Sequence, residues 1–331
     1  MAKKVMHAVR YEGYCDGATG LRYAEVPVPS PKKDEVLLRM EAASLNPADY
    51  KIKKGMARPF LPCKFPFVPA TDVAGEVVDV GSGVKDLKAG DKVVAMLGFS
   101  VGGGLADFVV AHKTLTAKRA PEVTAAEAAG LPMAALTAHQ ALTICAGIKL
   151  DGNSSGKPAN ILVTAASGGV GHYAVQLAKL GNAHVTATCG ARNIELIKSL
   201  GADEVLDYKT ADGAALRSPS GRKYEAVIHC ATGIPWSTFE PNLSDNGKVI
   251  DLTPGPSALL TFVFKRLTFS KKQLIPMFVC AKKENLEFLV GLMKEGKLKT
   301  LVDSKYPLSN AEDALAKCID GHATGKIILE P

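Results

Sequence analysis

A run of small residues from Ala165 to Gly171, A-A-S-G-G-V-G, is the segment of this sequence best suited to bind a charged ligand. It follows an apolar, strand-like stretch, Ile161 to Thr164, and leads into a helical pattern, Val170 to Leu180. Small residues let the backbone turn tightly, and free N–H groups at a helix N-terminus attract a pyrophosphate. The run fits the pattern G-x-G-x-x-G with Ala166 in the first position. A glycine turn that binds nothing is the alternative. We predict a dinucleotide site that includes Ser167, Gly168, Gly169 and Val170.

The end of the next predicted strand indicates which dinucleotide binds. The segment His184 to Thr188 continues into Cys189, Gly190, Ala191 and Arg192, with no acidic residue. Enzymes that use NAD typically place an acid here to accept a hydrogen bond from the ribose 2′-OH, whereas the planar fork of an arginine suits a 2′-phosphate. The alternative is that Arg192 is only an exposed cation at a helix start. We expect the cofactor to be NADPH (NADP+), with these four residues among those that bind it.

The elements around these residues alternate between strands and helices from Asn160 onward. The predicted strands are Ile161 to Thr164, His184 to Thr188, Glu204 to Leu206, Ala226 to Cys230 and Lys248 to Leu252, with helices at Val170 to Leu180 and Asn193 to Leu200. This rhythm is typical of an α/β fold, a doubly wound Rossmann domain with a parallel sheet. Ligands of such sheets bind at the carboxyl ends of the strands, which adds Cys230, Ala231, Leu252 and Thr253 to the predicted cofactor site.

The first third of the chain has a different pattern. Short strands such as Val73 to Val80 are separated by Gly and Pro turns, which favours a small β-rich, barrel-like domain. Further predicted elements are an Ala-rich helix, Ala125 to Ala141, a surface loop, Asp151 to Pro158, helices at Asn285 to Glu295 and Asn310 to Asp320, and a closing strand, Lys326 to Leu329.

Composition limits the classes of protein that fit. The chain has 331 residues, 47% of them hydrophobic, which is enough for two domains with separate cores. Its net charge of +7 comes without a concentrated basic stripe, so no nucleic-acid partner is expected. Its 7 cysteines form no C-x-x-C pair, which favours reduced thiols in an intracellular compartment. No apolar run approaches the ~20 residues of a spanning helix. The first eleven residues lack the apolar region of a cleavable signal.

Ordered landmarks along nearly the whole chain carry a family resemblance. They are S-L-N-P-A-D-Y-K (Ser44 to Lys51), F-V-P-A-T-D-V-A-G-E-V (Phe67 to Val77), L-P-M-A-A-L-T-A (Leu131 to Ala138), A-A-S-G-G-V-G, L-G-A-D-E-V-L-D-Y (Leu200 to Tyr208) and H-A-T-G-K-I-I (His322 to Ile328). The chain resembles the quinone oxidoreductase branch of the medium-chain dehydrogenase/reductase superfamily, especially its plant chloroplast-envelope and enone oxidoreductase members. The resemblance implies a GroES-like catalytic domain at residues 1–127 and 282–331 and a Rossmann domain at 128–281. It also implies a homodimer, and a location at the inner chloroplast envelope or in the stroma, with the cytoplasm as the alternative.

No metal is expected in this chain. Asn46 stands where zinc-dependent relatives place a catalytic cysteine, and Thr71 stands where they place a histidine. The segment Met96 to Asp107 contains none of the cysteines of their structural zinc lobe, and zinc needs three or four such ligands. Without a Lewis acid, hydride addition to a conjugated enone, a γ-ketol or a quinone is more plausible than reduction of an unactivated carbonyl.

The resemblance also assigns site residues. It implies that Asn46, Asp49 and Lys51 line the nicotinamide end of a cleft and that Tyr50 closes the pocket or donates a proton, so that Asn46, Tyr50 and Lys51 are the expected catalytic residues. Further cofactor contacts implied by the resemblance are Thr137, Tyr208, His322 and Ala323. Simpler alternatives stay open: Asn46 caps a turn, Asp49 and Lys51 are surface charges, and Tyr50 belongs to the core. The loops Gly55 to Cys63 and Phe99 to Leu105 are expected to shape the substrate pocket.

One apolar segment with four cations, Leu259 to Phe278, is predicted to form a subunit-interface strand and a lid over the pocket. A peripheral membrane contact is its alternative. For the whole chain, the expected function is NADPH-dependent reduction of a conjugated C=C bond or a quinone. The alternatives are a weakly catalytic dinucleotide-binding protein with an RNA-binding or structural role, a specialised plant biosynthetic reductase, and a reductase of ordinary aldehydes or ketones.

Overall fold

The computed structural model describes residues 4–151 and 157–331. The chain forms two compact units: unit 1 is Met1–Leu136 with Ala281–Pro331, and unit 2 is Thr137–Cys280. These units divide at 136/137 and 280/281. The domain boundaries implied by the resemblance, 127/128 and 281/282, stay a prediction. Most of the predicted loop Asp151 to Pro158 lies outside the described residues. Within the described part of the chain, no helix is both long and apolar enough to cross a membrane.

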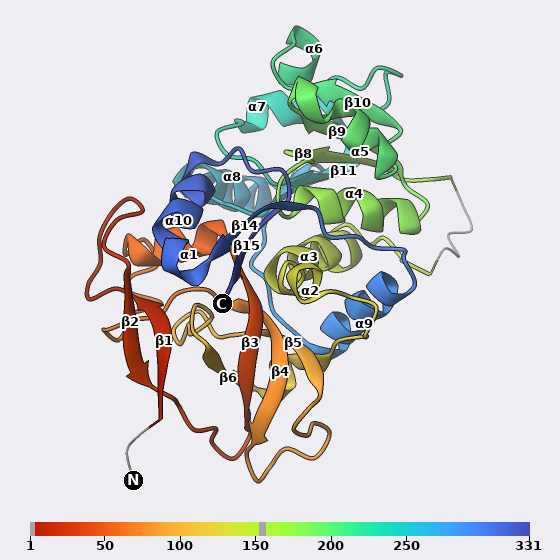
Figure 1. Cartoon of the computed structure of the whole chain (residues 1–331). Coiled ribbons are helices and arrows are strands. Elements are labelled where there is room, and N and C mark those ends of the chain that lie inside the picture. The colour runs from red at the N-terminus through yellow and green to blue at the C-terminus, as the bar shows by residue number, and fades with distance from the viewer. Residues whose placement is uncertain (1–3, 152–156) are drawn as a thin grey trace. The chain divides into compact units, whose positions relative to one another are not determined.

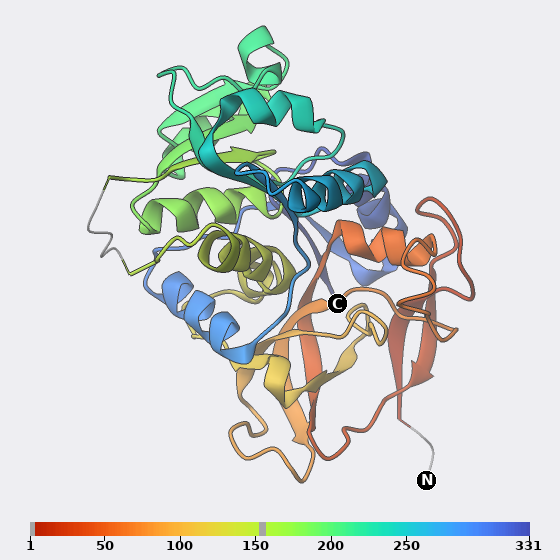
Figure 2. The same cartoon turned by 180° about the vertical axis from the view of Figure 1, so that it is seen from behind.

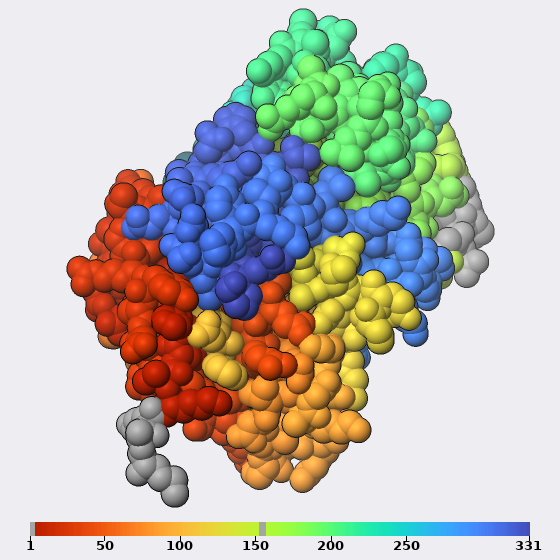
Figure 3. Space-filling view, viewed as in Figure 1, coloured from red at the N-terminus to blue at the C-terminus, as the bar shows by residue number. Residues whose placement is uncertain are grey.

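Unit 1 is built on a mostly antiparallel sheet, as the Gly- and Pro-punctuated strands predict. Its central strand β3 (Glu35–Leu45) pairs antiparallel with β4 (Asp72–Val80), β6 (Phe108–His112) and β15 (Lys326–Glu330). The remaining strands are β14 (Val302–Pro307), β5 (Lys92–Met96) and β7 (Thr116–Lys118), in the order β14-β15-β3-β4-β5-β7, and a separate hairpin of β1 (Val5–Arg10) and β2 (Arg22–Pro27). The C-terminal end of the chain, blue in Figures 1 and 3, therefore packs against N-terminal strands drawn in red.

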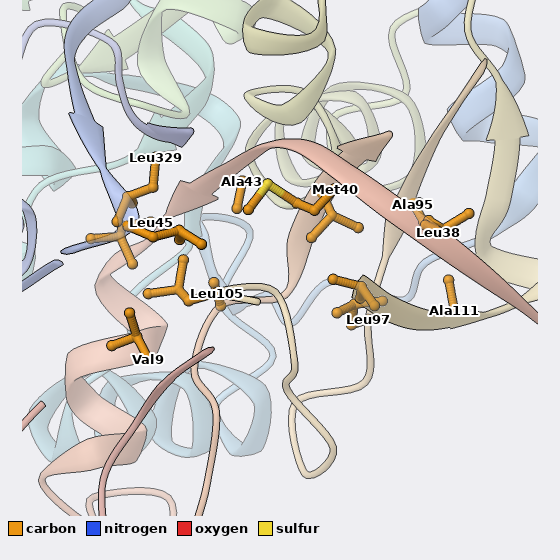
Figure 4. Packing of buried hydrophobic residues seen from close by; sticks show 14 of the residues in the cluster. Val9, Leu38, Met40, Ala43, Leu45, Ala95, Leu97, Leu105, Ala111 and Leu329 are labelled. Atoms are coloured by element: carbon orange, nitrogen blue, oxygen red, sulfur yellow. The ribbon is translucent and has the colours of Figure 1, made fainter. Parts of the chain in front are cut away.

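The core of unit 1 is made by alternating side chains of these strands. Val9, Leu45, Leu105 and Leu329 come from distant parts of the sequence and lie near one another, while Leu38 lies beside Ala95 in the same cluster (Figure 4). All six are less than 5% exposed. Burial of such apolar side chains is the dominant favourable contribution to folding.

The helices of unit 1 flank this sheet. They are α1 (Pro47–Lys53), α2 (Ala125–Ala129), α9 (Lys283–Lys294) and α10 (Ala311–Asp320), while α3 (Pro132–Gln140) carries the chain into unit 2. The single helix predicted over Ala125 to Ala141 is wrong, because the structure breaks it at Gly130 and Leu131. Pro132 is the reason: it has no N–H for the preceding turn but fits the first position of a new helix.

Unit 2 is a six-stranded, wholly parallel sheet, which confirms the predicted doubly wound fold. Its strands are β8 (Asn160–Thr164), β9 (His184–Cys189), β10 (Glu204–Asp207), β11 (Tyr224–His229), β12 (Leu243–Asp251) and β13 (Gln273–Pro276), in the order β10-β9-β8-β11-β12-β13. The order reverses between β8 and β11, where such sheets bind their ligands. Figures 1 and 2 show the sheet from its two sides. The helices are α4 (Gly171–Leu180), α5 (Ile194–Ser199), α6 (Ala211–Ala214), α7 (Trp236–Phe239) and α8 (Pro256–Leu267).

The segment Leu259 to Phe278 is only in part the strand that the sequence analysis predicts, while its roles as a subunit interface and as a lid stay predictions. Its first half belongs to helix α8, and only Gln273 to Pro276 forms a strand, β13, at the edge of the sheet. The helix begins at Pro256, directly after Gly255, and a proline at the first position is preorganised for a helix. This start signal outweighs the strand preference of the residues that follow.

Candidate active site

The glycine run of unit 2 connects β8 to the N-terminus of α4, as predicted. A Cβ at Gly171 would lie 2.3 Å from the carbonyl oxygen of Ala165 and 2.7 Å from the Cα of Ala166, so only glycine fits where the helix meets the strand. At Gly168 the nearest atom would be 3.2 Å away. Ala165, the first residue of the run, has a φ of 48°, in the left-handed region. The backbone is thus bent as a pyrophosphate cradle requires.

The ends of β9 and β10 lie side by side next to this cradle. Asp207 pairs with Cys189 in the sheet, and the Tyr208 N–H donates to the Cys189 carbonyl over 3.1 Å. A Cβ at Gly190 would lie 3.6 Å from the Tyr208 ring, so the structure brings these two predicted cofactor residues together. Ala191 and Arg192 are exposed in the turn that follows β9. Burial raises the pKa of the Cys189 thiol to about 11, so this side chain stays neutral.

Lys209 adds a cation at this edge that the sequence analysis did not identify. Its Nζ lies 5.9 Å from the centre of the Tyr208 ring, within the range of a cation–π contact. Arg192 and Lys209 follow two neighbouring strand ends, where the positive charge can neutralise a phosphate. The available signal was a lysine directly after the landmark Leu200 to Tyr208.

The ends of β8, β11 and β12 are tied by a second set of hydrogen bonds, which we call the strand-end network. The Thr164 hydroxyl accepts from the N–H groups of Cys230 (3.0 Å) and Ala231 (3.3 Å). The Thr253 hydroxyl donates to the Ala231 carbonyl over 3.0 Å, and the Leu252 N–H donates to the His229 carbonyl. Four predicted cofactor residues are therefore held in two adjoining turns.

In unit 1, Asn46 belongs to a group of buried polar side chains that we call the buried ion cluster: Asn46, Asp49, Asp72 and Lys326. Asn46 Nδ2 donates to Asp72 Oδ2 over 2.9 Å, and Lys326 Nζ donates to Asn46 Oδ1 over 2.5 Å. The ammonium also lies 3.8 Å from the Asp72 carboxylate. The four residues are at most 4% exposed. The cation must face the amide oxygen and the anion the amide nitrogen, so this network fixes the carboxamide in one orientation.

Burial dominates the electrostatics of the buried ion cluster. It raises the pKa of Asp72 and lowers that of Lys326, while the attraction between the two opposes both shifts. Burial also raises the pKa of Asp49 to about 7, against the stabilising N–H of Asn46, which donates to its carboxylate over 2.7 Å. Near neutral pH this site therefore holds a carboxyl group that can gain or lose a proton.

Helix α1 carries the other predicted catalytic residues. Asn46 is the N-cap of this helix and forms a capping box with Asp49, as the simpler alternative expects, and its carboxamide is also engaged by the cluster. Tyr50 packs partly buried against the core of unit 1, and burial raises its pKa, which keeps the phenol protonated. Lys51 is half-buried. Asp49 also lines a small recess with Phe67 and with Phe99, so one of the two predicted pocket loops contributes to it.

The remaining predicted cofactor residues occupy separate places. Thr137 is buried on α3, at 9% exposure. His322 is exposed just after α10, and its Nδ1 lies 3.1 Å from the Asp320 carboxylate. Ala323 packs partly buried against the core of unit 1. Whether any of these residues contacts a cofactor stays a prediction.

Comparison with known proteins identifies the family. The descriptions "Alcohol dehydrogenase GroES-like domain" and "Zinc-binding dehydrogenase" match residues 32–122 and 200–329. The chain is 71% identical, over the full length of both chains, to the chloroplast envelope quinone oxidoreductase homolog of Arabidopsis thaliana. The chain belongs to the quinone oxidoreductase branch of the medium-chain dehydrogenase/reductase superfamily. It is therefore an oxidoreductase that acts on small molecules and uses a pyridine nucleotide.

Two further relatives extend this placement. The NADPH-dependent alkenal/one oxidoreductase of Arabidopsis thaliana chloroplasts is 34% identical, with 93% of this chain and 75% of that protein covered. The solved structure of the quinone oxidoreductase from Coxiella burnetii shares 28% identity at a TM-score of 0.86, covering 99% of this chain and all of that one. The GroES-like and Rossmann parts expected from the sequence are thus confirmed.

The description "zinc-binding" does not fit the donor set of this oxidoreductase. Asn46 and Thr71 replace the ligands expected in zinc-dependent relatives, and a lysine ammonium points at the Asn46 carboxamide oxygen. In residues 4–151 and 157–331, no three His, Cys, Asp or Glu side chains are grouped so as to hold a metal ion. A second cation beside the Lys326 ammonium would be repelled.

Besides Lys209, the sequence analysis missed Asp72, Lys326 and Thr164. Asp72 and Lys326 complete the buried ion cluster, and Thr164 is the centre of the strand-end network. Of these three residues, only Asp72 has a signal in the sequence: it directly follows Thr71, which stands at the position of a zinc ligand in zinc-dependent relatives. Lys326 read as the first residue of a closing strand, and Thr164 as the last residue of a buried one.

Proposed function

We propose that this oxidoreductase uses NADPH to reduce the C=C bond of α,β-unsaturated carbonyls, such as enones and γ-ketols, or to reduce quinones, without zinc. The observation that carries the proposal is the glycine cradle between β8 and α4, followed at the end of β9 by an arginine and not by an acid. The first feature supports a dinucleotide and the second supports a phosphate on its ribose.

The residues present fit NADPH well. A side chain at position 171 would clash with the backbone of Ala165 and Ala166. Only glycine therefore allows the start of α4 to lie this close to the end of β8. The exposed Arg192 and the neighbouring Lys209 supply positive charge where the 2′-phosphate would lie. Tyr208 offers a half-exposed ring beside Gly190, suited to contact an adenosine.

The expected chemistry needs no Lewis acid. When bound, NADPH supplies a hydride, which adds to the β-carbon of the conjugated acceptor. Lys51, which is a half-buried residue, would stabilise the negative charge that develops on the carbonyl oxygen. The α-carbon takes a proton from Tyr50 or from solvent, and Asn46 lines the nicotinamide end of the site. The similarity to an alkenal/one oxidoreductase and to a quinone oxidoreductase homolog supports both substrate classes.

The decisive experiment follows NADPH oxidation, with NADH in parallel, against enones, γ-ketols, quinones and saturated aldehydes, with and without a chelator. We expect turnover of the conjugated compounds with NADPH preferred, and no effect of the chelator. Turnover restricted to saturated aldehydes, or lost with the chelator, would contradict the zinc-free proposal. Binding of NADPH without turnover of any compound would favour a binding role.

A homodimer is proposed from the apolar surface of unit 2. Leu260, Phe264 and Leu267 on α8 are 72%, 62% and 73% exposed, and the helix packs against the edge strand β13. An exposed apolar helix beside an open strand edge is well suited to a second copy of the same chain. Light scattering should give twice the mass of the chain, and Leu260→Lys with Phe264→Lys should give a monomer. A monomeric wild type that binds anionic vesicles would instead favour a peripheral membrane contact.

We also assign this chain to the chloroplast. The support is its 71% identity, over the full length of both chains, to the chloroplast envelope quinone oxidoreductase homolog of Arabidopsis thaliana. Fractionation of isolated chloroplasts should recover the protein in the envelope or the stroma. Recovery only from the cytosol would overturn the assignment.

A further inference from the structure

The hydroxyl of Thr164 makes three polar contacts inside unit 2, and their number determines the direction of each. Besides the N–H groups of Cys230 and Ala231, it lies 2.9 Å from Nδ1 of His229. A hydroxyl has two lone pairs and one hydrogen. The two backbone N–H groups can only donate, so they occupy both lone pairs. The hydrogen of Thr164 is left for Nδ1, which must accept it.

This assignment makes His229 a neutral ring with its proton on Nε2. The side chain is 4% exposed and packs edge-on against Phe239, with the ring centres 4.9 Å apart. Burial lowers the pKa of His229, against the attraction of Asp251, which agrees with a neutral imidazole. A protonated ring would carry a hydrogen on Nδ1, and Thr164 would have to give up one of its two N–H partners.

The three contacts join the ends of three strands at the point where the strand order reverses. Thr164 ends β8, His229 ends β11, and the Ala231 carbonyl accepts from Thr253, just beyond β12. β8 and β11 are neighbours in the sheet (Figure 1). Thr164 itself is fully buried, so it can act on a ligand only through the two turns that it holds.

The thiol of Cys230 does not explain why this turn is fixed. Burial raises its pKa to about 12, and its Sγ donates to the Ile228 carbonyl over 3.7 Å. The turn can therefore contact a ligand through its backbone. The conformation of that backbone depends on the two hydrogen bonds that Thr164 accepts from the N–H groups of Cys230 and Ala231. A displaced turn would move Ala231 and, through the Ala231 carbonyl, Thr253.

We propose that Thr164 is a positioning residue for the nicotinamide nucleotide: its hydroxyl, oriented by His229, holds the turn Cys230 to Ala231 and the adjoining Thr253 in the conformation that binds the cofactor. The proposal rests on the proposed function, since it requires that the chain bind such a nucleotide. The turns lie after β11 and β12, whereas the phosphate-selecting cations Arg192 and Lys209 follow β9 and β10. Thr164 therefore governs the affinity for NADPH and for NADH alike.

The test compares Thr164→Val with wild type by titrating NADPH and NADH, each followed by fluorescence or calorimetry, together with thermal unfolding. Valine keeps the shape of threonine and removes only the hydroxyl. We expect the Kd values of both nucleotides to rise by the same factor, about tenfold. Thr164→Ser, which restores a hydroxyl, should recover most of the affinity. Arg192→Ala should weaken NADPH only.

A matched control separates positioning from stability. Thr186, in the middle of β9, is also buried, and its hydroxyl donates to Glu204 over 2.9 Å. Thr186→Val should lower the Tm as Thr164→Val does, and leave both Kd values unchanged. If Thr164→Val lowers the Tm and leaves both Kd values at the wild-type level, the hydroxyl only supports the sheet and the proposal is overturned. If wild type binds neither nucleotide, it is the proposed function that fails.

A second pair of variants covers the case that Thr164→Val does not fold. In His229→Asn the carboxamide oxygen can replace Nδ1 as the acceptor. In His229→Leu the side chain is similar in size to that of asparagine but has no acceptor. We expect His229→Asn to bind both nucleotides within about threefold of wild type and His229→Leu to bind them about tenfold more weakly. Equal affinities in the two variants would overturn the orienting role of His229 and with it the proposal.

Discussion

Unit 1 and unit 2 each bury a group of polar side chains, but the chemistry of the two groups differs. The buried ion cluster of unit 1 contains two carboxyl groups and an ammonium, all at most 4% exposed. The strand-end network of unit 2 is held by two threonine hydroxyls, a neutral imidazole and backbone N–H groups. The first group depends on charge and the second on hydrogen-bond direction.

This difference decides how each unit responds to substitution. A buried charge that loses its partner keeps its desolvation penalty, so the loss exceeds the value of the bond itself. A neutral hydroxyl that is removed leaves polar groups that cost less to bury. We therefore expect substitutions in the buried ion cluster to act mainly on stability and substitutions in the strand-end network to act mainly on ligand binding.

The largest effect is expected for Lys326→Met, which removes the ammonium and preserves much of the side-chain volume. Asp72 would be left fully buried without its cation, and the Asn46 oxygen would lose its donor. Breaking a buried pair in this way costs about 3–5 kcal/mol. Hydrogen exchange measured by mass spectrometry should show the loss of protection in β3, β4 and β15 of unit 1.

The control for this substitution is the double variant Lys326→Met with Asp72→Asn, which removes both charges. It should regain a large part of the lost stability. Trp236 is the single tryptophan of the chain and lies in unit 2, so its fluorescence reports on unit 2 separately. If the double variant is less stable than Lys326→Met alone, the charge argument is wrong.

In unit 2 the strictest requirement is for space and not for charge. Gly171→Ala would place a Cβ 2.3 Å from the Ala165 carbonyl oxygen, and both neighbours are backbone atoms that cannot rotate away. Overpacking of this kind costs about 1–3 kcal/mol, and the shift of α4 should abolish measurable NADPH binding. Gly168→Ala, with its nearest atom at 3.2 Å, serves as the milder partner. Equal NADPH affinity in the two variants would contradict the cradle.

The same contrast explains what the sequence could predict. The cofactor cradle consists of consecutive residues, and the strand ends of a parallel sheet meet at one edge, so unit 2 follows from local patterns. The buried ion cluster joins residues that are 26 and 280 positions apart, through strands paired only in the folded chain. No local periodicity marks such partners. Lys326 in particular lies in a stretch, K-I-I-L-E, whose pattern predicts only a strand.

Helix α8 shows a different limit of sequence analysis. Its aromatic and β-branched residues favour a strand, and the structure forms a helix because Gly255 and Pro256 set its start. Helix α1 is absent from the predicted elements, because its 7 residues are too short for a clear helical period. The Pro47 that follows Asn46 is its first residue, in the position that proline prefers.

A moderate effect is expected for Asp49→Asn, and it depends on pH. The folded pKa of Asp49 is about 7, above the usual value of about 3.9, so the folded state holds a proton that the unfolded state has released. This group's contribution to stability is therefore complete below the unfolded pKa and is lost as the pH rises toward 7. Asparagine keeps an acceptor for the Asn46 N–H and does not titrate.

The measurement is the free energy of unfolding of both proteins at a series of pH values. Relative to wild type, Asp49→Asn should gain about 1–2 kcal/mol between pH 5.5 and pH 7, at about 1.4 kcal/mol per pKa unit. Above pH 8 the difference should be constant. A difference that does not change with pH would show that Asp49 is already ionised throughout and that the cluster is more polar than its burial indicates.

The smallest effect on stability is expected for Arg192→Ala, the counterpart in unit 2 of the buried lysine of unit 1. Arg192 is exposed, so its removal should change the free energy of unfolding by less than about 0.5 kcal/mol. It nevertheless follows the end of β9, where the 2′-phosphate is proposed to bind, so NADPH affinity should fall about tenfold or more, while NADH affinity stays the same. Lys209→Ala should repeat this pattern more weakly. Equal losses for the two nucleotides would move the phosphate site elsewhere. Together with Lys326→Met, this variant tests whether a cation in this chain serves stability when it is buried and ligand selection when it is exposed.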